Sequence, residues 1–208
     1  MKLYRTTDPK LSGSELEPAG GFVSSLRRIG TTVDVSRARS EDWAAISRML
    51  ELYQHDLSNL WDQDLNERGE YGYDVTRYAD DPCCLAFVFR VAGRYAGFAL
   101  VDPSVRLPQD EWWLAQFFVI RKYRLQGVGR LAAHAVFDRV RGRWEVGQMA
   151  GNHAAQAFWR GVIAGYTQGR FVEHGLDDRR WVGLLQCFDN TAGDTQQGLS
   201  TLSAKERP

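Results

Sequence analysis

Residues 121–130 carry the residue types best suited to binding an anion, in the order Arg-Lys-Tyr-Arg-Leu-Gln-Gly-Val-Gly-Arg. Four of these ten residues are basic, whereas the whole chain has 26 basic and 26 acidic residues. The segment follows an apolar run and precedes a helical pattern, so its backbone N–H groups lie at a helix start, where the helix dipole favours an anion. Gly127 and Gly129 let a phosphate approach the backbone closely. The pattern therefore indicates a pyrophosphate site.

Two other interpretations of this segment stay open at the level of sequence. It could be a helix start with a solvated basic loop, although two glycines there lower helix stability. It also matches the G-x-G-x-x-A dinucleotide fingerprint through Gly127, Gly129 and Ala132, with Glu145 near the expected acidic position. That fingerprint needs a turn directly from strand to glycine, whereas six residues separate Ile120 from Gly127. The spacing therefore disfavours a dinucleotide site.

The elements that must position this segment follow from the spacing of apolar residues. Period-two alternation and short apolar runs predict strands over residues 33–38, 84–90, 95–101, 112–120, 144–148, 168–173 and 180–186. Helical spacing predicts helices over residues 40–53, 74–79, 127–136 and 152–163, with a loop over 58–72. Hairpins upstream and crossover helices downstream imply an α/β (α+β) fold, in which a mixed, mostly antiparallel sheet of about seven strands is flanked by about four helices.

The ends of the chain lack such patterns. Residues 1–32 are predicted to be a loosely ordered tail, because Gly, Pro and Ser interrupt them without periodicity. Residues 189–208 are polar and are predicted to be a second tail. One domain is expected between them, over residues 33–188.

Two motifs resemble those of the GNAT acetyltransferase superfamily. The R-x-x-G-x-G run that begins at Arg124 resembles the superfamily's Q/R-x-x-G-x-G/A signature, and the N-x-x-A-x-x-F-W run that begins at Asn152 is similar to its N-x-x-A-x-x-F-Y helix. The expected element order is also similar, and the resemblance extends over roughly residues 33–188. Two motifs in the right order are a specific signal, whereas either alone would be weak.

The resemblance implies an N-acetyltransferase that moves an acetyl group from acetyl-CoA to a primary amine of a small molecule or peptide by direct attack. A backbone N–H near Val119 would then stabilise the oxyanion. The contacts to acetyl-CoA would come from the end of a strand, the glycine loop and the following helices. These residues are Phe118, Val119, Arg124, Gln126, Gly127, Val128, Gly129, Arg130, Asn152 and Phe158.

The catalytic positions depart from the superfamily's pattern. Many relatives carry Glu where Gln116 stands, and an amide cannot act as a base at neutral pH. Many also carry Tyr where Trp159 stands, and an indole N–H is a donor without being a practical acid. Glu111 opens the same strand as Gln116 and is a candidate base, while Trp159 is expected near the thioester sulfur. The same departures would suit a degenerate member that binds acyl-CoA or a protein partner without turnover.

The acceptor amine is expected between the first two helices and the final hairpin. Acidic and aromatic residues cluster in that part of the sequence and would suit a cationic acceptor. They could equally be ordinary surface residues of a loop and a helix end. The residues expected to bind the acceptor are Tyr53, His55, Asp56, Tyr73 and Gln116.

Composition argues against several other classes of function. A formal net charge of zero disfavours nucleic acid or an anionic membrane as the main partner, and no apolar run is long enough to span a bilayer. Cys83, Cys84 and Cys187 form neither a disulfide framework nor a metal-binding spacing, so reduced thiols in a cytoplasmic protein without a bound metal are expected. Members of the superfamily often form homodimers, which makes a homodimer one expected state.

Overall fold

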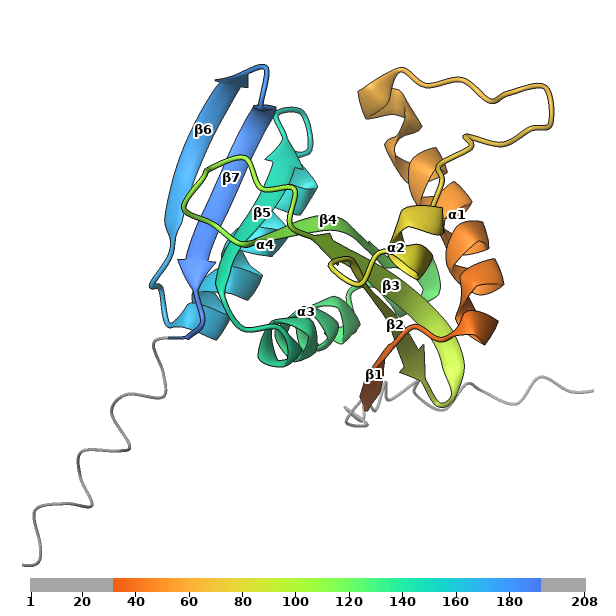
Figure 1. Cartoon of the computed structure of the whole chain (residues 1–208), viewed down its shortest axis with the longest axis horizontal. Helices are drawn as coiled ribbons and strands as arrows, with labels where there is room; N and C mark the ends of the chain where they lie inside the picture. The colour runs from red at the N-terminus through yellow and green to blue at the C-terminus, as the bar shows by residue number, and fades with distance from the viewer. Residues whose placement is uncertain (1–31, 192–208) are drawn as a thin grey trace, which may run out of the picture.

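Seven strands form one mixed sheet in the order β1-β2-β3-β4-β5-β7-β6 (Figure 1). The structure, a computed structural model, describes residues 32–191. The strands are β1 Val33–Arg37, β2 Leu85–Val91, β3 Arg94–Asp102, β4 Trp112–Val119, β5 Arg143–Met149, β6 Val172–Asp178 and β7 Trp181–Asp189. Every neighbouring pair is antiparallel except β4 with β5, which is parallel. The predicted mixed, mostly antiparallel sheet is confirmed.

Helices cover both faces of this sheet, as Figure 1 shows. They are α1 Trp43–Trp61, α2 Thr76–Asp80, α3 Val128–Arg139 and α4 His153–Thr167, with short 3-10 turns η1 Ser40–Asp42 and η2 Arg121–Tyr123. The alternation of β2 explains the layering. Ala86 and Val88 pack with the cluster that includes α1 and α2, whereas Phe87 and Phe89 pack with the cluster that includes α3 and α4.

The position of β6 was predicted wrongly. The pattern placed this strand at residues 168–173, but α4 runs on to Thr167 and ends through the left-handed residues Gln168 (φ 56°) and Gly169 (φ 81°). Gln168 and Gly169, which were expected to begin the strand, therefore belong to the turn that ends α4, and β6 begins at Val172. The first helix likewise extends to Trp61, and its end replaces the start of the loop predicted over residues 58–72.

The predicted tails fall largely outside the described residues. Of the expected N-terminal tail only residue 32 is described, and of the expected C-terminal tail only residues 189–191. The described C-terminal end is held by Asn190, whose side chain accepts a 2.8 Å hydrogen bond from the Gly142 N–H and donates one of 2.7 Å to the Phe137 carbonyl. The packed fold therefore reaches slightly beyond the predicted boundary at residue 188.

Candidate active site

β4 and β5 are paired only where both strands begin. Trp112 lies opposite Trp144 and Trp113 opposite Glu145, and these are the pairs that join the two strands within residues 32–191. Further along, β4 remains paired with β3, and β5 with β7. The two strands therefore diverge at the centre of the sheet, as their arrows do in Figure 1.

The divergence leaves one edge of β4 available to a ligand. The Ile120 N–H donates a 2.8 Å hydrogen bond to the Ala96 carbonyl, so it points toward the start of β3. Backbone groups of successive residues in a strand point to opposite sides, so the Val119 N–H points toward the diverging β5. An extended, peptide-like ligand can add to such an edge as a strand would.

The start of α3 has the geometry of an anion site. Gly127 precedes the helix with φ +81°, a left-handed conformation that favours glycine, and an added Cβ there would meet no atom within 4 Å. The Leu131 N–H donates to the Gly127 carbonyl at 3.1 Å, which is the first hydrogen bond of the helix. The N–H groups of residues 128–130 therefore precede the helical ladder and are free of it. Together with the helix dipole they favour a phosphate.

Asp56 ties the loop before α3 to α1. Its carboxylate accepts hydrogen bonds from Arg124 and, at 3.0 Å, from Arg121. The Arg124 Nε also donates to the Val119 carbonyl at 2.7 Å, and the guanidinium lies 5.3 Å from the centre of the Phe118 ring. Arg124 and Asp56 thus engage each other and hold the loop against the end of β4.

The first two turns of α4 contact both the glycine loop and the central strand β4. Asn152 caps this helix by accepting a 3.1 Å hydrogen bond from the Ala155 N–H. A Cβ added at Gly129 would lie 3.1 Å from the ring of the half-exposed Phe158. The next residue, Trp159, is buried and packs edge-to-face on Phe117 with ring centres 4.9 Å apart. Two adjacent side chains of α4 therefore reach the glycine loop and the central strand.

A cavity of about 330 Å³ lies beside the diverging part of β4 and β5. It is bounded by α1, α2, α4, the segment after β3, and the strands β4, β5 and β7. Its wall is rich in aromatic side chains, which are Tyr53, Trp61, Tyr73, Tyr78, Trp113, Trp159 and Trp181. This is the place expected for the acceptor, between the first two helices and the final hairpin.

Amide side chains supply much of the polar lining. Gln116 comes from β4, Gln148 from β5 and Asn152 from the start of α4. Gln148 is only 3% exposed, and its Nε2 donates to the Val146 carbonyl at 2.8 Å. Its Oε1 is buried without a hydrogen-bond partner in the described part of the chain. An unpaired buried acceptor is costly, so this oxygen is suited to an N–H donor from a ligand.

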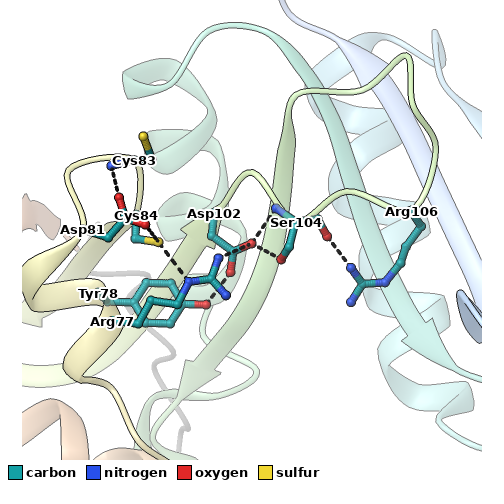
Figure 2. A network of polar contacts seen from close by, with 8 residues as sticks. All are labelled: Arg77, Tyr78, Asp81, Cys83, Cys84, Asp102, Ser104 and Arg106. Carbon is teal, nitrogen blue, oxygen red and sulfur yellow. Dashed lines mark hydrogen bonds and ion pairs between the residues drawn. The ribbon is translucent and has the colours of Figure 1, made fainter.

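Asp102 is the one carboxylate that lines the cavity in the described structure. Figure 2 shows it at the end of β3, facing Arg77 and Tyr78 of α2. Its Oδ2 accepts a 2.5 Å hydrogen bond from the Tyr78 hydroxyl. Its Oδ1 accepts a 2.8 Å hydrogen bond from the Ser104 N–H and lies 3.3 Å from the Arg77 guanidinium. Burial and the neighbouring carboxylate raise the pKa of Tyr78, which keeps this hydroxyl a donor.

Arg106 lies in the segment between β3 and β4, with its guanidinium carbon 4.4 Å from the centre of the Trp113 ring and 5.8 Å from that of Trp181. It also donates to the Ser104 carbonyl, a bond drawn in Figure 2. The buried Glu145 fixes the backbone of this segment. Its carboxylate accepts hydrogen bonds of 2.6 Å from the backbone N–H groups of Arg106 and Leu107.

Glu145 is fully buried, and burial raises the pKa of its carboxyl to about 6. The N–H groups of Arg106 and Leu107 act in the opposite direction, and the neighbouring Asp110 raises it further. A carboxylate placed under this loop is not available to a ribose hydroxyl. The structure therefore removes the acidic partner that a dinucleotide site would need.

A model of the acetyltransferase (GNAT) family matches residues 46–162, which is more than half of the chain. The chain belongs to the GNAT acetyltransferase family. None of the curated protein sequences matches it.

Solved structures share this GNAT fold at low sequence identity. An acetyltransferase from Thermus thermophilus is 20% identical with a TM-score of 0.50, and the match covers 75% of this chain and 95% of that chain. A variant of the BH1408 protein from Bacillus halodurans is 15% identical with a TM-score of 0.51, covering 62% and 90%. The PaiA N-acetyltransferase from Thermoplasma acidophilum, solved in complex with coenzyme A, is 12% identical with a TM-score of 0.49, covering 76% and 99%.

The structure brings together some of the predicted acceptor residues of this GNAT chain and separates others. Tyr53, Tyr73 and Gln116 line the cavity. His55 does not line it, and its Nδ1 lies 3.2 Å from the Tyr71 hydroxyl instead. Asp56 is also outside the lining, where it holds the arginines of the loop.

The two predicted catalytic residues lie apart. Trp159 lines the cavity, whereas Glu111 is absent from its lining. The Glu111 carboxylate accepts a 2.9 Å hydrogen bond from the Arg143 N–H and lies 3.7 Å from that residue's guanidinium. Glu111 directly precedes β4, and its half-exposed side chain contacts the first residue of β5. This position favours a structural role for Glu111 over that of a base.

Of the predicted acetyl-CoA contacts, the residues at the start of α3 are the ones best placed. Within the loop before α3, the side-chain amide of the exposed Gln126 donates to the Lys122 carbonyl at 2.7 Å. Val128 is fully buried and can offer only its N–H, while Arg130 is exposed. Phe118 packs its ring on Tyr53, with ring centres 5.6 Å apart, on the α1 face of the sheet.

Several cavity residues were missed at the sequence level, namely Arg77, Tyr78, Asp102, Arg106, Trp113, Gln148 and Trp181. One signal was present, since Asp102 and Pro103 lie where a buried strand passes into a loop, and loops often carry binding residues. None of the described helices is long and apolar enough to cross a membrane. Within the same residues, no group of three or more His, Cys, Asp or Glu is arranged to hold a metal ion.

Proposed function

We propose that this chain transfers an acetyl group from acetyl-CoA to a primary amine bound in the cavity. The observation that supports this best is the divergence of β4 and β5 between a glycine-led helix start and an aromatic cavity. Phe158 and Trp159 connect the two places, because one contacts Gly129 and the other lines the cavity. A ligand that runs along the edge of β4 would pass from one to the other.

The chain's residues fit acetyl-CoA, which supplies a thioester-bound acetyl group when bound. The N–H groups of residues 128–130 would hold the pyrophosphate, with positive charge from the exposed Lys122 and Arg130. The Val119 N–H would donate to the amide-containing arm. Arg124 and Asp56 would act indirectly, by fixing the loop that carries Gly127.

The aromatic side chains around the proposed position of the acetyl group favour a small acyl group. Phe117, Phe158 and Trp159 pack on one another in tilted or edge-to-face pairs with ring centres between 4.9 and 6.3 Å apart. Such a cluster leaves little unfilled volume behind the central strand, because packed aromatic rings interdigitate as in a protein core. An acetyl group suits this space better than a long acyl chain.

The amine is proposed to react as its free base, without a side-chain base. Gln116 and Gln148 can accept a hydrogen bond from the amine but cannot take its proton at neutral pH. Both oxygens of Asp102 are engaged by Tyr78, Ser104 and Arg77. Tyr53 also lines the cavity, and burial raises its pKa to about 12, so its hydroxyl stays a donor throughout the neutral range. The cavity would therefore orient the nucleophile and exclude water.

The test is amine-dependent turnover. Purified protein is mixed with acetyl-CoA and a panel of primary amines, free thiol is measured over time, and the products are identified by mass spectrometry. Release of thiol that depends on the amine, together with an N-acetylated product, supports the proposal. Binding of acetyl-CoA with no acetylation of any amine would instead identify a non-catalytic member of the fold.

A further inference from the structure

The charge of the cavity differs from what the nearby sequence suggests. The acidic residues clustered around α1 led to the expectation of a cationic acceptor, but Asp102 is the one carboxylate in the lining of the described structure. Arg77 and Arg106 line the same space, so two positive charges face one negative charge. The lining therefore carries a formal charge of +1. A polyamine or another polycation would be repelled by it.

The two arginines differ in whether a carboxylate neutralises their charge. Arg77 lies 3.3 Å from the Asp102 carboxylate and also donates to the Cys84 sulfur at 3.3 Å. Within residues 32–191 Arg106 forms no ion pair, and its side chain donates a hydrogen bond to the neutral Ser104 carbonyl. Its remaining N–H donors are therefore available for an anionic group.

Arg106 is also held in place before any ligand arrives. The guanidinium lies over Trp113, which is itself buried and packs edge-to-face on Trp181 with ring centres 5.3 Å apart. The backbone N–H groups of Arg106 and Leu107 are anchored by the buried Glu145. A cation that is stacked and anchored loses less conformational entropy on binding an anion than a free surface side chain does.

We infer that the acceptor is a monoamine that also carries an anionic oxygen group, a carboxylate or a phosphate, which Arg106 binds beside Trp113 and Trp181. This inference rests on the proposed function, because it assigns the substrate class of the same cavity. The amine end would face the amides of Gln116 and Gln148, where the unpaired Oε1 of Gln148 can accept an N–H. The aromatic wall would hold the apolar body between the two ends.

The experiment compares matched ligands by calorimetry, and by tryptophan fluorescence because Trp113 and Trp181 flank the guanidinium. Coenzyme A is present, so that no transfer takes place. The pairs are phenylalanine with phenylalaninamide, and phosphoethanolamine with ethanolamine, which separate a carboxylate from a phosphate. Spermidine serves as the polycation. Each is measured with the wild type, Arg106→Ala, Arg106→Lys and the control Arg94→Ala, an exposed residue of the β2–β3 hairpin.

The expected result is tighter binding of the anionic member of at least one pair by the wild type. Arg106→Ala should lower the affinity for that ligand by about 10- to 100-fold, because a hydrogen-bonded charge pair contributes about that factor to binding. The affinity for its neutral partner should change little. Arg106→Lys should retain part of the affinity and Arg94→Ala all of it. For each ligand, the affinity of a variant is divided by that of the wild type, which cancels the effect of differences in amine pKa between ligands.

Three outcomes would overturn the inference. They are preferential binding of spermidine or the neutral amines, equal losses for both members of a pair in Arg106→Ala, and failure of the wild type to bind either anionic amine. The binding measurement does not depend on turnover. If coenzyme A binds and no amine is ever acetylated, the proposed function fails, while the preference for an anionic amine is still decided by these titrations.

Discussion

The Tyr78 hydroxyl donates a 2.5 Å hydrogen bond to the Asp102 carboxylate and thereby joins the short helix α2 to the end of β3. Both residues are buried and both line the cavity. A five-residue helix has little stability of its own, since a single turn barely repays nucleation. The contact with Asp102 is therefore central to how α2 forms one wall of the candidate acceptor site.

Asp102→Asn should destabilise the fold. The amide keeps the size of the carboxylate but loses its charge, which leaves Arg77 without its anionic partner and Tyr78 with a weaker acceptor. We expect a loss of about 1–3 kcal/mol in the free energy of unfolding, measured by chemical denaturation. Asp178→Asn, which removes the carboxylate of an exposed ion pair with Arg180, should have a smaller effect. Equal effects of the two substitutions would contradict the role given to Asp102.

Gly147→Ala should disturb the acceptor cavity specifically. A Cβ at residue 147 would lie 2.3 Å from the buried Trp113 ring, so the ring must move. Overpacking of this kind costs about 1–3 kcal/mol. The KM for the amine should rise more than the KM for acetyl-CoA. In the control Gly161→Ala, a Cβ in α4 meets nothing within 4 Å, and stability should rise by about 0.5–1 kcal/mol. An unchanged amine KM in Gly147→Ala would argue against this place for the acceptor.

Glu145 should make stability depend on pH in a defined direction. Burial raises its pKa to about 6 in the folded chain, above the value of about 4.3 for an unfolded Glu. The protonated form is thus favoured by folding, and the stability it contributes is complete below pH 4 and lost as pH rises through 6. The loss is on the order of 2 kcal/mol. Glu145→Gln should abolish it, so the difference in unfolding free energy between wild type and variant should change between pH 4.5 and pH 7.5. A difference that is constant with pH would refute the raised pKa.

The pH dependence of turnover should follow the acceptor. Without a side-chain base, kcat/KM should rise with pH until the amine of the acceptor is mostly unprotonated. Two acceptors with clearly different amine pKa values should then give rate profiles whose inflections differ by the same amount. The measurement is kcat/KM above pH 7 for each. An inflection at one pH for both acceptors would instead reveal a titrating group of the protein.

Much of this architecture can be predicted from local patterns. The strand, basic loop and glycine-led helix around Gly127 are contiguous, so their period and punctuation are read directly from the sequence. Asn152 likewise indicates where a helix begins, because Asn is a preferred N-cap residue and its side chain caps α4. The glycine-led helix start, at which we propose that the pyrophosphate binds, could be predicted because it consists of one short stretch of chain.

The acceptor cavity was harder to predict because its parts are distant in sequence. Tyr78 and Asp102 are 24 residues apart, and Glu145 lies 39 residues from the Arg106 backbone that it anchors. A local pattern gives the face on which a side chain lies but not which distant partner meets it. For the same reason the acid cluster near α1 suggested a cationic ligand, although Asp56 is already paired with Arg121 and Arg124.

The most direct test of the central proposal is the binding of acetyl-CoA at the start of α3. Wild type, Gly127→Glu and Gly93→Glu are titrated with acetyl-CoA by calorimetry. Gly127 and Gly93 both have positive φ, 81° and 73°, and neither has an atom within 4 Å of an added Cβ, so the backbone strain is matched at about 1 kcal/mol. Only the first substitution places a carboxylate at the proposed pyrophosphate site. Binding by the wild type and Gly93→Glu but not by Gly127→Glu is the predicted result, whereas equal binding by all three proteins, or none by a folded wild type, would contradict it.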